Sequence, residues 1–338
     1  MPRRWSTRLG AGTLLLTALA AVFAPALAPN APEVQLPDRA YAPPTRVRVW
    51  HDGGLRSPFI HAQLLDDRLM RRYREDTATL VPLRWFHDGR LVSSADAGVP
   101  LLLLGADALG RDVFSRVIHG ARLSLGVACL GVIGALAIGA LIGGLAGSAG
   151  GAVDHALMLL ADFVIVLPAA YLVLVLRGVL PLVLSVGTVF GLMAVLFALA
   201  AWPHAARGVR AIVAAERGRD YAEAARAAGA GRLRLAAHLL PAARGFLGVE
   251  LALLLPALLV AEATVSYLGL GFPEPTASWG TLLREAANFR VVSEAPWLLA
   301  PAIALFITVL GLQLAVASRA PANVLLGAGV DLAQERRR

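Results

Sequence analysis

Lysine is absent from this chain of 338 residues, and all 31 basic residues other than histidine are arginines. A phosphate-binding P-loop uses a lysine to contact the β- and γ-phosphates of a nucleotide, so the chain has no standard ATPase site of its own. The same absence excludes Schiff-base catalysis and the Ser/Lys hydrolase motifs. ATP chemistry of the standard kind would therefore have to come from another protein.

Cysteine is nearly absent, since Cys129 is the single one and lies within an apolar run. One cysteine provides no disulfide framework and no cysteine zinc site, and we expect it to be a packing residue. The seven histidines form no His-Glu-x-x-His sequence, and no Ser/His/Asp group or paired carboxylates occur at helical spacing within the apolar runs. We predict no catalytic residue, no metal site, no cofactor and no nucleic-acid partner.

Long apolar runs are abundant, because 57% of the residues are hydrophobic and the mean hydropathy is +0.67. A membrane-spanning helix needs about 20 mostly apolar residues. Six segments meet this requirement: Leu9–Ala28, Leu123–Ala146, Ala156–Leu176, Val179–Ala201, Phe246–Leu270 and Trp297–Ala317. The first also resembles a secretory signal peptide, but its apolar core is longer than usual, and we favour an uncleaved span.

The arginines predict how these spans are oriented. With the N-terminus inside, the cytoplasmic side would carry eight arginines between Arg207 and Arg244 and the Arg336–Arg338 group, while the short outer loops would carry only three. The positive-inside rule then predicts a multi-pass protein of the bacterial inner membrane with both termini and a 203–245 loop in the cytoplasm. The chain divides into an N-terminus with the first span (1–29), an extracytoplasmic insertion (30–104), a transmembrane domain (105–320) and a cytoplasmic tail (321–338).

The 30–104 insertion contains two turn signals. Asp52-Gly53 and Asp88-Gly89 each follow strand-forming residues, which is typical of β-hairpins. Between them, residues 66–76 are rich in charge and are predicted to form a solvated helix. We expect a small extracytoplasmic domain, and a disordered loop is the alternative. The amphipathic residues 105–125 that follow are predicted to lie along the membrane surface before the second span.

Polar and small residues inside the predicted spans indicate how the helices pack. Gly139, Gly143 and Gly147 repeat every four residues, which lets another helix approach closely. Asp162 and Glu262 are carboxylates within spans, where each would cost roughly 2.5–3.5 kcal/mol near a helix centre if it faced lipid. Each is expected to line a polar pathway or to bond a neighbouring helix. Glu262 lies near the outer boundary, where solvation is easier.

The loop from Asp220 to Pro241, DYAEAARAAGAGRLRLAAHLLP, combines helix formers with a glycine and a closing proline. Gly229 permits a turn between two short helices, and Pro241 is expected to end the second. Small alanine faces could enter a groove on a partner protein, where Glu223 could meet a basic residue. The surrounding arginines would meet anionic lipid.

Four stretches of the chain follow patterns of a known family. Glu223-Ala224-Ala225 and Gly229 match Glu-Ala-Ala-x-x-x-Gly, and Leu240-Pro241 match its closing Leu-Pro, although Ala242 replaces the usual Asn. Residues 110–125 match the segment before the second span, residues 266–271 and 278–280 match the signature after the fifth, and Asp162 and Pro168 match the third span. The chain resembles the permeases of ABC transporters, in particular the C-type subunit of the dipeptide/oligopeptide/nickel family.

This resemblance implies an all-α integral membrane permease subunit with six transmembrane helices. It would pair with a homologous permease and receive substrate from an extracytoplasmic binding protein. Separate ATPase subunits would contact a coupling loop formed by Asp220, Tyr221, Glu223, Ala224, Ala225, Gly229, Leu240 and Pro241. The substrates would be di- or oligopeptides, with nickel or another small solute as the alternative.

Two alternatives come from other functional classes. A secondary transporter would be driven by ions through Asp162 or Glu262, but the inverted repeats typical of such folds are not visible. A membrane-bound enzyme or sensor would use residues 30–122, in which no catalytic group is apparent.

Overall fold

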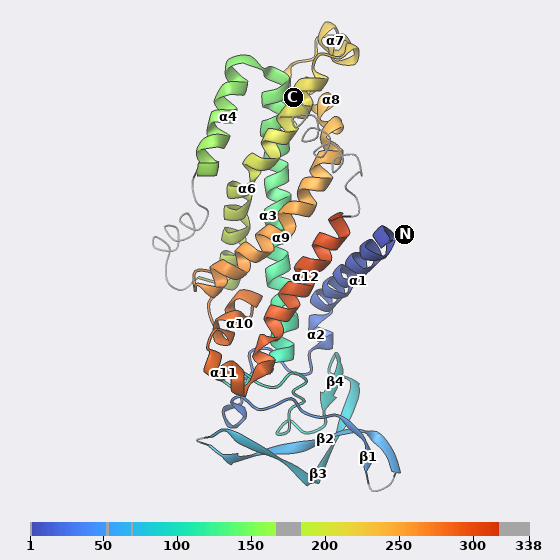
Figure 1. Cartoon of the computed structure of the whole chain (residues 1–338), viewed down its shortest axis with the longest axis vertical. Helices are drawn as coiled ribbons and strands as arrows, with labels where there is room; N and C mark the ends of the chain where they lie inside the picture. The colour runs from blue at the N-terminus through green and yellow to red at the C-terminus, as the bar shows by residue number, and fades with distance from the viewer. Residues whose placement is uncertain (1, 52–53, 69, 167–183, 318–338) are drawn as a thin grey trace, which may run out of the picture.

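Long helices run side by side through most of the molecule, with a small antiparallel sheet at one end and a pair of short helices at the other (Figure 1). This computed structural model describes residues 2–51, 54–68, 70–166 and 184–317. We call the end with the sheet the sheet end and the end with the short helices α7 (Asp220–Ala227) and α8 (Arg232–Leu239) the loop end. The tail 321–338, Pro168, and the parts of the third and fourth predicted spans between 167 and 183 lie outside the described residues.

The bundle is centred on α3 (Val113–Ala149) and α6 (Val186–Glu216), which pack along one another. At 1.5 Å per residue the 37 residues of α3 extend about 55 Å, well beyond the hydrocarbon thickness of a bilayer. Added Cβ atoms at Gly139, Gly143 and Gly147 would lie 2.6, 2.3 and 2.7 Å from atoms of α6. These glycines therefore allow the two backbones to come into close contact.

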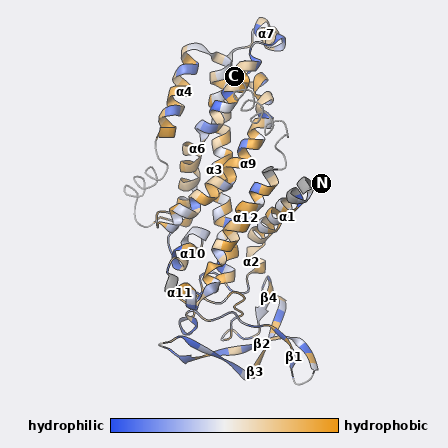
Figure 2. Ribbon diagram, viewed as in Figure 1, coloured by the Kyte–Doolittle hydropathy of each residue, from blue (hydrophilic) through white to orange (hydrophobic). Residues whose placement is uncertain are grey.

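The other long helices surround this pair: α1 (Pro2–Val22) with the short α2 (Ala24–Leu27), α4 (Gly151–Val166), α9 (Arg244–Tyr267) and α12 (Ala300–Ala317). Among the described residues, four segments are long and apolar enough to cross a membrane: Val113–Ala149, Val186–Glu216, Arg234–Tyr267 and Pro296–Ala315. The first predicted span forms α1, whose apolar part is Arg8–Val22, and the third is described only as far as α4. Figure 2 shows apolar residues concentrated on these helices and polar residues more abundant on the sheet.

The predicted 203–245 loop begins too early in the sequence. Residues 203–216 continue α6, with Pro203 inside the helix, because Ala205, Ala206 and Val209 are fully buried against α3. Burial of this small, apolar face outweighs the break that the proline suggests. The loop that remains comprises residues 217–243.

The insertion forms a four-stranded antiparallel meander in the order β1-β2-β3-β4. Its strands are β1 (Arg48–His51), β2 (Gly54–Asp67), β3 (Arg72–His87) and β4 (Arg90–Ser94). Both predicted hairpins are confirmed, since His51 pairs with Gly54 and His87 with Arg90. A small core of Ile60, Val81, Leu83 and Leu101 joins the sheet to the segment before α3.

The predicted helix over residues 66–76 is wrong. Asp66 and Asp67 complete β2 and residues 72–76 begin β3, with Leu65 opposite Tyr73 and Leu64 opposite Arg74. An ion pair of 2.6 Å between Arg48 and Glu75 adds a link from β1. Cross-strand pairing therefore overrides the local preference for helix in this charged segment.

The amphipathic residues 105–125 do not form a separate surface helix. Asp112 caps α3 by accepting a hydrogen bond from the Phe114 amide at 3.1 Å, and the helix then runs without a break into the apolar span. Two polar side chains of this segment, Arg111 and Arg116, are buried by partners in the chain. The prediction failed because the sequence alone did not reveal these partners.

Candidate functional site

The loop end is built from α7, α8 and the short 3-10 turn η2 (Leu240–Ala243). Gly229 has a φ of +81° and follows α7. The Gly229 amide donates to the Arg226 carbonyl at 2.9 Å, and the Ala230 amide donates to the Ala225 carbonyl at 3.0 Å. This is a Schellman ending, in which a left-handed residue closes the helix, so the glycine is required by its backbone conformation and not by space.

The inner face of α7 packs onto the bundle. Ala222 is fully buried in a small apolar cluster with Val209 and Val213 of α6 and Leu235 and Leu239 of α8. The Arg226 guanidinium donates to the Arg217 carbonyl at 2.5 Å, which adds a polar link to the end of α6. The two short helices are therefore attached to the end of α6.

The outer face of α7 is small and exposed. Tyr221 is 46% exposed, and its hydroxyl donates to Glu216 Oε2 at 2.8 Å. Asp220, Glu223 and Ala224 are also exposed, and within the described residues Glu223 has no ion-pair partner. Ala225 is half-buried and packs against the inner cluster. The expected flat face of paired alanines is thus divided, with Ala224 outward and Ala225 inward.

The second short helix, α8, ends at Leu239, just before Pro241, as expected. Pro241 lies exposed in η2, and helical backbone resumes in α9 at Arg244. A proline near the start of a helical turn is tolerated because its missing N–H would have no partner there. Leu240 packs against the inner cluster beside it. The loop is therefore continuous with α9 as well as with α6.

Two ion pairs join α4 to α6 near this end. Asp162 pairs with Arg207, and both side chains are about half exposed. The Asp154 carboxylate accepts hydrogen bonds from both Nε of Arg210, at 2.9 Å, and Nη2 of Arg210, at 2.5 Å. The structure thus places Asp162 in an interhelical ion pair, which agrees with the expectation that it bonds a neighbouring helix. The sequence interpretation treated Arg207 and Arg210 only as topology signals and did not identify them as the partners.

Glu262 is buried in α9 and is 0% exposed, so its expected solvation near the outer boundary is wrong. Its Oε1 accepts a hydrogen bond from Ser266 at 2.7 Å, while Oε2 has no partner among the described residues. The Ser124 and Ser278 side chains lie close by. Ser278 caps α10 (Trp279–Ala286) with a capping box, so Glu262 lies where α3, α9 and α10 meet.

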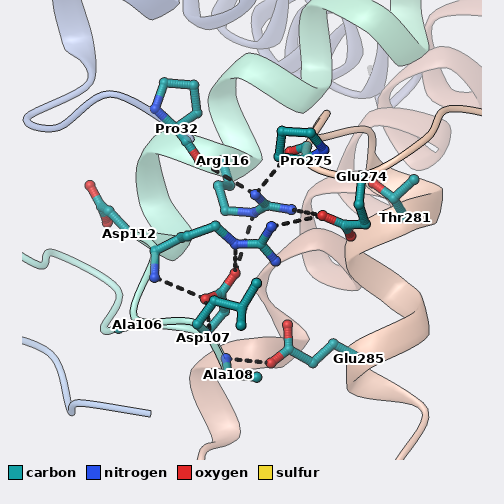
Figure 3. A network of polar contacts seen from close by, with 12 residues as sticks. Pro32, Ala106, Asp107, Ala108, Asp112, Arg116, Glu274, Pro275, Thr281 and Glu285 are labelled. Carbon is teal, nitrogen blue, oxygen red and sulfur yellow. Dashed lines mark hydrogen bonds and ion pairs between the residues drawn. The ribbon is translucent and has the colours of Figure 1, made fainter. Parts of the chain in front are cut away.

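A network of buried charges occupies the sheet end (Figure 3). Asp107 Oδ2 accepts a hydrogen bond from Arg111 Nε at 2.6 Å and lies 3.5 Å from Arg116 Nε. Both arginines reach Glu274 Oε2, with Arg111 Nη1 at 2.7 Å and Arg116 Nη2 at 3.6 Å. Asp107, Arg111 and Arg116 are almost completely buried, whereas the Glu274 side chain is 55% exposed.

The network joins two segments that are far apart in the sequence. Arg116 Nη1 donates to the Pro275 carbonyl at 3.2 Å, and the Ala108 amide donates to Glu285 Oε1 at 2.6 Å. The Trp279 indole, also buried, donates to the Val117 carbonyl at 3.0 Å. Charged side chains buried to this extent need partners, and here each charge faces at least one opposite charge. The start of α3 and the segment 274–285 are therefore held as one unit.

Sequence reasoning missed this network, although Arg111 and Arg116 lie within residues 110–125, a stretch that had been matched to a family pattern. The spacing of Asp107, Arg111 and Arg116 gives little local signal for the network. On a single helix, nine residues would place Arg116 about 180° from Asp107, so the spacing alone does not bring the three together. Glu274 and Glu285 approach from a distant part of the chain, which no local pattern indicates.

Comparison with known proteins gives a consistent match. The family model described as "Binding-protein-dependent transport system inner membrane component" matches residues 139–319. The nickel transport system permease protein NikC of Escherichia coli K12 is 37% identical over 214 residues, which cover 62% of this chain and 74% of that protein. The di/tripeptide transport system permease protein DppC of Pseudomonas aeruginosa is 35% identical over 237 residues, covering 69% and 76%. The oligopeptide transport system permease protein OppC of Bacillus subtilis is 35% identical over 211 residues, covering 61% and 66%.

Proposed function

Because this chain belongs to the family of binding-protein-dependent transport system inner membrane components, we propose that it is the permease subunit of an ATP-driven importer whose separate ATPases act on residues 217–243. Membership of that family also argues against the ion-coupled alternative, in which Asp162 or Glu262 would carry the coupling ion. The chain is a multi-pass membrane protein.

The observation that carries the coupling proposal is the two-sided character of α7. Its inner face is attached to α6 and α8 through Ala222, and its outer face presents Tyr221, Glu223 and Ala224 without cover. A partner that binds the outer face would therefore displace α6 and α9 together. The close glycine contacts between α6 and α3 would carry that displacement toward the sheet end.

The same proposal gives the orientation of the chain in the membrane and the partners at each end. The loop end faces the cytoplasm, with both termini on that side, and the sheet end faces the outer compartment. A homologous permease completes the pathway, and a binding protein delivers substrate at the sheet end. The placement of eight arginines between Arg207 and Arg244 supports this orientation.

Peptides are the substrate class that we propose. Relatives named as peptide, di/tripeptide and oligopeptide permeases match this chain at 35–37% identity. Nickel is the second candidate, because NikC matches equally well. The test is uptake by proteoliposomes that contain the complete transporter and its binding protein. ATP-dependent uptake of a short peptide, without uptake of nickel, would support the first candidate, and the reverse result would reject it.

Co-purification tests the coupling role. Glu223→Arg places a cation on the exposed face of α7, and we expect it to lower the amount of ATPase subunit recovered with the permease by at least about tenfold, equivalent to 1.4 kcal/mol or more. Glu33→Arg makes the same charge change at an exposed glutamate of the sheet end and should leave recovery unchanged. Equal recovery with both variants would reject α7 as the contact.

A further inference from the structure

An apolar groove of about 500 Å³ opens between α1, α3, α9 and α12. Its walls are formed by Leu14, Ala18 and Ala21 of α1, Gly126 and Cys129 of α3, and Leu312 of α12. Leu15, Leu16 and Val22 of α1 are exposed close to it, so this side of the bundle is suited to lipid. Nothing in the proposed transport function assigns a role to the groove.

One cationic side chain lies at the mouth of this groove. Arg122 lines the groove, is exposed, and has no ion-pair partner among the described residues. His119 lies one turn earlier on α3, and its Nδ1 bonds the Ser115 carbonyl at 2.9 Å. An unpaired arginine beside an apolar groove fits a phosphate better than it fits an apolar helix.

The β3–β4 hairpin places aromatic residues beside the same region. Its β4 strand contacts α2, and Arg90 Nη1 donates to the Pro29 carbonyl at 2.7 Å, so the hairpin is fixed to the outer end of α1 (Figure 1). Near its turn Trp85 is 52% exposed and Phe86 is 81% exposed. Tryptophan is enriched at the level of lipid headgroups. The exposed Trp85 therefore fits a headgroup region near the sheet end of the bundle.

We propose that the groove binds a phospholipid, with one acyl chain between α1 and α3 and the phosphate on Arg122. The other plausible occupant is a helix of another subunit. An α-helix about 10 Å across would fill this volume within roughly one turn, whereas the groove follows α3 from Arg122 to Cys129, about two turns. A flexible hydrocarbon chain fits this length and width, and the unpaired Arg122 supplies the charge that a headgroup requires.

Native mass spectrometry of the transporter, purified with its bound subunits and supplied with phosphatidylglycerol, tests the proposal. Arg122→Gln removes the cation, and Ala18→Phe fills the groove from an exposed position of α1 that no buried contact needs. We expect both variants to retain at least about fivefold less lipid, equivalent to roughly 1 kcal/mol. Arg56→Gln, at an exposed arginine on β2, should retain as much as the wild type. Wild-type retention in either Arg122→Gln or Ala18→Phe would overturn the proposal.

Cys129 provides a second measurement, because it is the chain's only cysteine and it lines the groove. A photoactivatable crosslinker attached to its thiol in the membrane-embedded transporter should couple to phospholipid. Coupling to another protein subunit instead would mean that a helix occupies the groove, and it would overturn the proposal.

Discussion

The two ends of the α3–α6 pair are stabilised by different kinds of interaction. At the sheet end, Arg111 and Arg116 are buried among Asp107, Glu274 and the Pro275 carbonyl. At the loop end, α7 is attached by a few apolar contacts around Ala222, and its charges face outward. Buried charges tolerate few alternative arrangements, whereas a small apolar cluster can be displaced at lower cost. The comparison suggests that buried charges fix the sheet end, whereas the loop end presents an exposed surface that suits the proposed partner.

The largest effect should come from breaking the fixed end. Arg116→Ala leaves Asp107 with one arginine fewer and removes the links to Glu274 and Pro275, and loss of one partner in a buried charge network costs about 3–5 kcal/mol. Glu274→Gln is the milder control, because that carboxylate is half exposed, and it should cost about 1 kcal/mol. Thermal unfolding of the purified protein would measure both. Equal, small losses would mean that the network does not hold the end together.

A pH dependence should also arise at the sheet end. Burial raises the pKa of Asp112 to about 6, against the opposing effect of its hydrogen bonds from Ser115, Asn30 and the Phe114 amide. Because the folded pKa lies above the ordinary value of 3.8, this group favours folding most below pH 4, and the contribution is lost as the pH rises through 6. The shift of about two units corresponds to at most about 3 kcal/mol.

Asp112→Asn tests this effect, because asparagine is an equally good helix cap but does not ionise. Unfolding midpoints measured from pH 4 to pH 7 should fall more steeply for the wild type than for the variant. Parallel curves would show that Asp112 does not titrate differently in the folded protein.

The connection between the two ends can be weakened at the glycine contacts. An alanine Cβ at Gly143 would lie 2.3 Å from the Ala206 carbonyl oxygen, so Gly143→Ala forces α3 and α6 apart and should cost about 1–3 kcal/mol. Gly191→Ala on α6 meets no atom within 4 Å and should instead gain up to about 1 kcal/mol through helix propensity. The two unfolding midpoints should therefore move in opposite directions. If both variants shifted the unfolding midpoint in the same direction, the close contact between α3 and α6 would not contribute to stability.

The smallest effect on stability should come from the loop end. Gly229→Ala forces an alanine into a left-handed conformation, which costs roughly 1–2 kcal/mol locally. Because α7 is a peripheral element, the global unfolding midpoint should hardly move, while substrate-stimulated ATP hydrolysis by the complex should fall. Gly218→Ala, at an unhindered glycine of the same loop whose φ is not positive, should leave ATP hydrolysis unchanged. If ATP hydrolysis stayed normal in Gly229→Ala, coupling would not depend on the left-handed turn at this residue.

The sequence predicted the features that depend on local pattern. Apolar runs located the four spans found among the described residues, Asp-Gly turns located both hairpins, and the glycine break in the loop located the end of α7. The errors occurred where distant residues decide the outcome. Pairing of Leu65 with Tyr73 turned a charged segment into strand, and burial of Ala206 against α3 extended α6 past Pro203.

The candidate site was predicted unevenly for the same reason. The residues of the loop were identified, but not that Ala225 turns inward while Ala224 faces outward, because that depends on where α6 lies. The buried network was missed, since Arg111 and Arg116 acquire their partners from residues 274–285. A single sequence does not record which distant segments meet.

Crosslinking from the outer face of α7 tests the central claim most directly. A cysteine at Ala224, in a chain with Cys129 replaced by alanine, should crosslink to an ATPase subunit of the assembled transporter. A cysteine at the buried Ala222 should not. If Ala224→Cys gives no crosslink to any nucleotide-binding subunit, or if a membrane-impermeant reagent labels it from the outer compartment, the loop end is not where ATP hydrolysis acts on this permease.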